Sequence, residues 1–148
     1  MEGRQETEAG LEALLAEPAP SVTAALGRLS GDILILGAAG KMGPSLAAMA
    51  VRGSREAGVG RRVIGVARFL DRTNRELLER AGVETIAGDL FDADFLAGLP
   101  DADNVLYLIG QKFGTIRLEA RTWAINAWLP GAVARRFATS RIVAWSSG

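Results

Sequence analysis

Residues 32–50, DILILGAAGKMGPSLAAMA, constrain the fold more than any other segment of this chain. An apolar run is interrupted by Gly37, Gly40 and Gly43 and then resumes as a helical pattern of small residues. Short apolar runs are typical of strands that are covered on both faces, as in parallel sheets. A glycine-rich turn from such a strand into a helix is typical of the first unit of an α/β sheet. We therefore expect an α/β fold.

The rest of the chain alternates between apolar runs and helical segments. Strands are expected at residues 32–37, 61–67, 82–89, 103–110 and 140–147, and helices at 44–51, 72–81, 92–97 and 117–138. The polar, glycine-rich residues 52–62 are expected to form an exposed loop. Alternating strands and helices indicate βαβ units with right-handed crossovers between parallel strands. The expected fold is a Rossmann-type, doubly wound parallel sheet of about five strands in the order 3-2-1-4-5.

Two short helices are expected ahead of this sheet. Three leucines in residues 11–15 have helical spacing, and Ser21 could cap a second helix after two prolines. We therefore divide the chain into an N-terminal helical extension, residues 1–30, and a sheet domain, residues 31–148. Within the last long helix of that domain, Pro130 removes a hydrogen-bond donor, so we expect a kink just before it.

The composition limits the chemistry that the chain can carry. There is no cysteine and no histidine, which excludes disulfides, thiolate nucleophiles, imidazole bases and the usual zinc ligands, and we expect no metal site. Basic and acidic side chains cancel at 17 each, and no basic stretch is interleaved with aromatics, so no nucleic-acid partner is expected. The acidic N-terminal segment lacks an apolar run long enough for a signal peptide or membrane span, which predicts a cytoplasmic protein without a membrane partner.

The three glycines also indicate what the turn binds. In turns of this kind the first glycine allows a tight backbone, the second lets a pyrophosphate approach the backbone, and the third lets the helix pack closely on the strand. The helix N-terminus adds amide hydrogens and a partial positive charge. A dinucleotide is therefore expected across Gly37, Ala38, Ala39, Gly40, Lys41, Met42 and Gly43. The alternative is a tight turn without a ligand.

The spacing G-x-x-G-x-x-G resembles that of the extended short-chain dehydrogenase/reductase family, the NAD(P)-dependent epimerases and dehydratases of nucleotide sugars. The resemblance extends over residues 31–148. The motif AGDL resembles the end of the family's third strand, which implies that Asp89 contacts the adenine amino group with Leu90 beside it. The motif VLYLIG resembles the fourth strand, which implies that the backbone of Leu108, Ile109 and Gly110 lies against the cofactor.

Two later motifs extend the resemblance. The run WAINAWLPGAVA looks like the family's long helix, with Asn126 as its asparagine. The run RIVAWSSG looks like the fifth strand and the turn after it, which implies that Ser147 holds the position of the catalytic Ser or Thr. Each residue also has an ordinary structural alternative: Asp89 could cap the helix that begins near residue 92, Asn126 could be solvated, and Ser147 could be a loop serine.

The residue after the second strand indicates which dinucleotide is bound. An acid there holds the ribose hydroxyls of NAD, whereas an arginine accommodates the extra phosphate of NADP. Arg68 occupies this position, and a guanidinium can pair with a phosphate through two hydrogen bonds. We therefore expect NADP rather than NAD. Asp71 is an alternative acid, and Lys41 is a second candidate partner for a phosphate.

The chemistry of the resembled family depends on a Tyr-x-x-x-Lys pair after the serine, and this chain ends at Gly148 before such a pair. The single tyrosine, Tyr107, is followed by Gln111 at the fourth position and is not part of one. We expect the dinucleotide-binding portion of an NAD(P)-dependent sugar epimerase/dehydratase-type oxidoreductase, inactive alone, whose small-molecule substrate is a nucleotide sugar. Its fifth strand would be an uncovered apolar edge, which predicts a homo-oligomer or a missing C-terminal half.

Two other functions remain open at this point. A natural chain without the Tyr-x-x-x-Lys pair would fit a non-catalytic NAD(P)-binding sensor or regulatory module. The run GAAGKMG is also similar to the glycine loop of dihydrodipicolinate reductases, including the basic residue before the methionine. The histidine-rich catalytic stretch of that family has no counterpart in this sequence.

Overall fold

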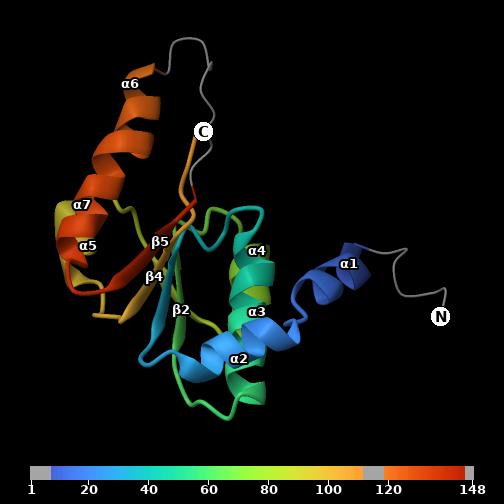
Figure 1. Ribbon diagram of the computed structural model, residues 1–148. Helices are drawn as coiled ribbons and strands as arrows, with labels where there is room; N and C mark the ends of the chain where they lie inside the picture. The colour runs from blue at the N-terminus through green and yellow to red at the C-terminus, as the bar shows by residue number, and fades with distance from the viewer. Residues whose placement is uncertain (1–7, 112–118, 146–148) are drawn as a thin grey trace.

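The computed structural model describes residues 8–111 and 119–145, which form three layers: a parallel sheet between two layers of helices (Figure 1). The strands are β1 (Ile33–Leu36), β2 (Val63–Ala67), β3 (Glu84–Ala87), β4 (Asn104–Tyr107) and β5 (Arg141–Ala144). Their order is β3-β2-β1-β4-β5, and every neighbouring pair is parallel. The expected Rossmann-type sheet is confirmed.

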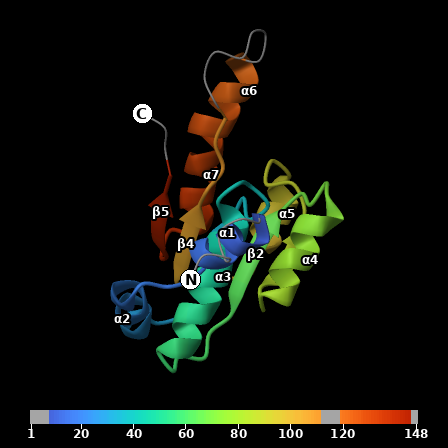
Figure 2. The same cartoon turned by 90° about the vertical axis from the view of Figure 1, so that its right-hand side faces the viewer.

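Helices cover both faces of the sheet (Figure 2). One face carries α2 (Pro20–Arg28), α3 (Gly43–Glu56) and α4 (Arg72–Arg80), with α1 (Glu8–Leu15) ahead of them. The other carries α5 (Ala93–Gly98) and a helix in three parts, α6 (Glu119–Trp123), η1 (Ala124–Trp128) and α7 (Leu129–Arg136). None of the helices in the described residues is long and apolar enough to cross a membrane.

The side chains of β1 show why this strand is apolar throughout. Ile33 and Ile35 belong to the core cluster under α2, α3 and α4. Leu34 and Leu36 belong to the cluster under α5 and α7. Because both faces are covered, all four residues are buried, and a polar residue at any of them would lose its hydration.

Helix α3 is longer than the sequence indicates. It ends at Glu56, so residues 52–56, which we expected in a loop, are helical. A Cβ atom on Gly53 would lie 2.6 Å from Cδ1 of Leu26 and 3.4 Å from Cβ of Pro18. The missing side chain therefore lets α2 pack directly against α3. This tertiary contact overrides the weak helix propensity of the segment, which is the reason that the local composition was misleading.

Helix α2 is held to the sheet domain by an arginine. Helix α2 begins at Pro20, so Ser21 lies inside its first turn and does not cap it as expected. Nη2 of Arg61 donates hydrogen bonds to the carbonyls of Leu26 and Leu29, at 2.6 and 2.7 Å. These bonds satisfy carbonyl groups at the C-terminal end of α2 and fix it beside the start of β2.

The irregularity expected at Pro130 is a π turn, η1, within a helix that continues from α6 into α7. The N–H of Leu129 donates to the carbonyl of Ala124, five residues back, and Pro130 has no N–H. The carbonyl of Ile125 therefore loses both of its usual donors. The Tyr107 hydroxyl donates to it instead, at 3.1 Å. Tyr107 is 3% exposed, and burial raises its pKa to about 12, which suits a structural residue.

Strand β5 is an edge of the sheet in the described part of the chain, pairing there with β4 alone. All four of its residues are exposed; Val143 is 51% exposed, and Trp145, directly after the strand, is 46% exposed. The expected uncovered, apolar edge is therefore present.

Candidate functional site

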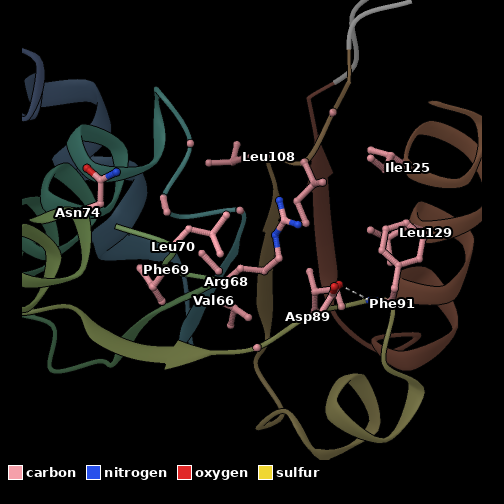
Figure 3. A pocket seen from close by; sticks show the side chains of 18 of the residues that line it. Val66, Arg68, Phe69, Leu70, Asn74, Asp89, Phe91, Leu108, Ile125 and Leu129 are labelled. Carbon is pink, nitrogen blue, oxygen red and sulfur yellow. Dashed lines mark hydrogen bonds between the residues drawn. The ribbon is translucent and has the colours of Figure 1, made fainter. Parts of the chain in front are cut away.

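A cavity of about 720 Å³ opens at the carboxyl ends of the strands (Figure 3). The chain passes from β1 to β2 and β3 on one side, whereas β4 and β5 lie on the other side of β1. The cavity lies beside β1, where the strand order reverses. Ligands of doubly wound sheets bind at this switch point, and the volume lies within the range of small-molecule sites.

The turn after β1 forms one wall of the cavity, which Gly37, Ala39 and Gly40 line. Gly37 has φ of +90°, a conformation that favours glycine, and its N–H donates to the carbonyl of Val66 at 2.9 Å. A Cβ atom on Gly37 would also lie 2.8 Å from Cγ1 of Ile109. The first glycine is therefore required both by backbone conformation and by the closeness of the β4 end.

The other two glycines meet different surroundings. A Cβ atom on Gly43 would overlap the backbone of Ala38, so this position brings the start of α3 against the turn. A Cβ atom on Gly40 would meet only the carbonyl oxygen of Gly37, at 3.2 Å. Lys41 and Met42 are exposed and, like Gly43, do not line the cavity. The turn therefore faces the cavity with Gly37, Ala39 and Gly40 only.

The segment after β2 forms a second wall. Figure 3 shows Arg68 projecting into the middle of the pocket, between Leu70 and Asp89. The next residue, Phe69, has φ of +47°, which is unusual for a residue other than glycine and turns the chain sharply after Arg68. Asp71 also lines the cavity, but its carboxylate caps α4 by accepting the N–H of Thr73 at 2.9 Å.

Asp89 and Leu90 line the cavity after β3. Oδ1 of Asp89 accepts the N–H of Phe91 at 3.0 Å, which fixes the carboxylate within a local turn. Asp92 caps α5, by accepting the N–H groups of Asp94 and Phe95, so the alternative that Asp89 is the helix cap is wrong. Asp89 remains exposed at the cavity, whereas Leu90 is buried beneath it.

Leu108, Ile109 and Gly110 line the cavity at the end of β4. This end is anchored by Asn126, whose side-chain amide donates to the carbonyl of Gln111 at 2.8 Å and accepts its N–H at 3.0 Å. The alternative of a solvated Asn126 is therefore wrong. The two bonds join η1 to the segment after β4 as a neighbouring strand would, and they hold these two parts of the cavity wall together.

The helical layer supplies lining residues that we did not anticipate, namely Arg121, Ala124, Ile125 and Leu129. The spacing of four between the first, third and fourth is the signal that could have revealed them, because such residues share one helix face. Beside them, Phe91 of the cavity wall stacks on Trp128, with ring centroids 5.8 Å apart. Ser147, the expected catalytic serine, lies outside the described residues.

Solved structures with this fold include several oxidoreductases. A short-chain type dehydrogenase/reductase from Mycobacterium marinum aligns with a TM-score of 0.62 and 21% identity, over 84% of this chain and 59% of that protein. ADP-L-glycero-D-manno-heptose-6-epimerase from Helicobacter pylori aligns with a TM-score of 0.60 and 20% identity, over 80% of this chain and 40% of that protein.

A third structure contains a cofactor. A short-chain dehydrogenase/reductase superfamily protein from Agrobacterium tumefaciens, with bound NAD, aligns with a TM-score of 0.50 and 24% identity, over 78% of this chain and 32% of that protein. The chain thus has the fold of short-chain dehydrogenase/reductase structures and spans less than two thirds of their length. No protein-family model and no curated protein sequence matches it.

Proposed function

We propose that this chain binds NAD(P) in the cavity at the carboxyl ends of its strands, as the dinucleotide-binding portion of an NAD(P)-dependent sugar epimerase/dehydratase-type oxidoreductase. One observation carries the proposal: four segments that are separate in sequence meet around a single cavity. They contribute the glycine turn after β1, Arg68 after β2, Asp89 after β3 and the backbone end of β4.

The residues present fit a dinucleotide. A side chain at Gly37 would collide with Ile109, so the turn keeps its backbone bare at the cavity wall, where phosphates of such ligands lie. The carboxylate of Asp89 uses one oxygen for Phe91 and has further lone pairs to accept a hydrogen bond from an adenine amino group. Leu90 offers an apolar surface next to it.

Arg68 supports a preference for NADP. It projects into the cavity and forms no hydrogen bond or ion pair with any described residue, so its guanidinium is available for the 2′-phosphate. Asp71 is the competing candidate, because it could accept from ribose hydroxyls of NAD. Its carboxylate is already occupied in part by Thr73.

The nicotinamide, when bound, would accept and return a hydride at a carbon of the substrate. The two hydrogen bonds between Gln111 and Asn126 would hold the end of β4 rigid beside the nicotinamide, where Gly110 is exposed. Ser147 would orient the hydroxyl that loses its proton, a role that rests on its place in the sequence after β5. The substrate class that we propose is a nucleotide sugar.

Titration with NADPH and NADH, followed by nicotinamide fluorescence, tests cofactor binding. We expect wild type to bind NADPH more tightly, and Arg68→Ala to lose this preference by about tenfold or more, since a charge-assisted bond to phosphate is lost. Arg72→Ala is the matched control, because that side chain is 93% exposed and does not line the cavity. Failure of wild type to bind either cofactor would refute the proposal.

A further inference from the structure

Two arginines line the cavity from different layers of the molecule. Arg68 follows β2, whereas Arg121 belongs to α6. Both are exposed, and neither forms a hydrogen bond or ion pair with any residue in 8–111 or 119–145. Five other arginines of the described segments pair with carboxylates: Arg62, Arg72, Arg75, Arg80 and Arg136. The two cavity arginines are instead available to pair with an anion that enters the cavity.

The acids of the cavity do not neutralise these arginines. Asp71 accepts the N–H of Thr73, and Asp89 accepts the N–H of Phe91. Both carboxylates are therefore directed to backbone donors of their own turns, although Asp71 lies only three residues from Arg68. The cavity keeps two cations whose hydrogen-bond donors are free for an anionic ligand.

Arg121 belongs to the wall of the cavity that α6 and η1 form. It lies one helical turn before Ile125, which also lines the cavity, and Asn126 anchors the same helix to Gln111 at the end of β4. The β4 end in turn touches the glycine turn, because a Cβ atom on Gly37 would lie 2.8 Å from Ile109. The helix that carries Arg121 is thus tied to the strand end that lies against the glycine turn.

Arg68 follows β2, which lies on the other side of β1 from β4. In the sheet, β1 separates β2 from β4, so the two walls begin two strand spacings apart, roughly 10 Å. NADP carries two separate anionic groups, the pyrophosphate and the 2′-phosphate. Two cations on separate walls match this distribution better than they match a ligand with a single phosphate.

We propose that Arg121 binds the pyrophosphate of the dinucleotide, from the wall formed by α6 and the β4 end, while Arg68 addresses the 2′-phosphate. This inference rests on the proposed function, and it deepens it by assigning the pyrophosphate a side-chain partner in addition to the backbone of the glycine turn. Arg121 is thus a binding residue that recognises what NAD and NADP share.

Binding of NADH, NADPH and 2′-AMP to wild type and variants tests this assignment. Arg121→Gln should weaken NADH and NADPH by the same factor, roughly 10- to 100-fold, and leave competition by 2′-AMP unchanged, because 2′-AMP has no pyrophosphate. Arg68→Gln should weaken NADPH and 2′-AMP but not NADH. Arg135→Gln is the matched control, since Arg135 is an exposed residue of α7 that does not line the cavity.

The possible outcomes separate this inference from the proposed function. If wild type binds no nicotinamide cofactor, the proposed function itself fails. If wild type binds and Arg121→Gln binds NADH as tightly, or loses only NADPH, the assignment to the pyrophosphate is wrong. Thermal unfolding of each variant checks the fold, and we expect unchanged midpoints because Arg121 has no partner among the described residues. The salt dependence of NADH binding should also become less steep in Arg121→Gln.

Discussion

Raising the pH above 10 should destabilise this fold through one buried hydroxyl. Burial raises the pKa of Tyr107 from 10 to about 12, because the charged phenolate would lose hydration under the α6–α7 helix. The folded state therefore holds the proton more tightly than the unfolded chain. Its contribution to stability is complete below pH 10 and is lost progressively as the pH rises from 10 to about 12.

The size of the effect follows from the same shift. A difference of two pKa units corresponds to roughly 3 kcal/mol between the two protonation states, at about 1.4 kcal/mol per unit. In Tyr107→Phe this pH dependence is absent, but the carbonyl of Ile125 loses its donor, which costs about 1–3 kcal/mol at neutral pH. The free energies of unfolding of wild type and variant should therefore converge between pH 10 and 12.

The assay is unusually direct because the chain contains a single tyrosine. The ultraviolet absorbance of tyrosinate reports the ionisation of Tyr107 alone, and urea unfolding at each pH gives the free energy. An absorbance midpoint near pH 10 in the folded protein, or a constant stability difference between wild type and Tyr107→Phe across this range, would refute the argument that Tyr107 is buried and bonded under η1.

Two substitutions test the contacts that position the cavity walls, at the start of α3 and at the end of β4. Gly43→Ala should lower the free energy of unfolding by about 3 kcal/mol, since the added Cβ overlaps the Ala38 backbone, which cannot move aside as a side chain can. The control is Gly131→Ala, at a helical glycine where an added Cβ meets no atom within 4 Å; it should stabilise the fold by up to about 1 kcal/mol. Equal effects of the two substitutions in urea unfolding would contradict this reasoning. Asn126→Leu should raise amide hydrogen exchange at Gln111 and weaken NADPH binding several-fold, because the bonds that position the β4 end are lost; unchanged exchange would show that the strand end is fixed by other contacts.

The strands and their order could be predicted because both depend on local patterns. Continuous apolar runs identify strands covered on both faces, and the glycine turn after β1 identifies the first crossover. The end of α3 could not be predicted, since it depends on Gly53 meeting Leu26 from a helix distant in sequence. Arg121 was missed because its four-residue spacing from Ile125 groups the two on one helix face but does not show that this face lines a cavity.

Asp89 and Asp92 illustrate a finer limit. Both stand near the start of α5 and both are favourable caps by residue type. Only the backbone path decides that Asp92 accepts the first helical N–H groups while Asp89 turns to Phe91. Residue type therefore predicted the kind of bond but not which of the two carboxylates would be left at the cavity.

The π turn has a consequence for the direction in which the helix points its side chains. An α-helix rotates by about 100° per residue, so residues at spacings of four drift around it by about 40° at each step. Arg121, Ile125 and Leu129 would spread over about 80° in a regular helix, but η1 holds one residue more than an α turn and removes most of this spread. Pro130 thereby keeps Arg121 in phase with the apolar residues of the wall. Loss of that single extra residue would rotate a neighbour of Arg121 into its place, and so change the charge of the cavity without any substitution in it.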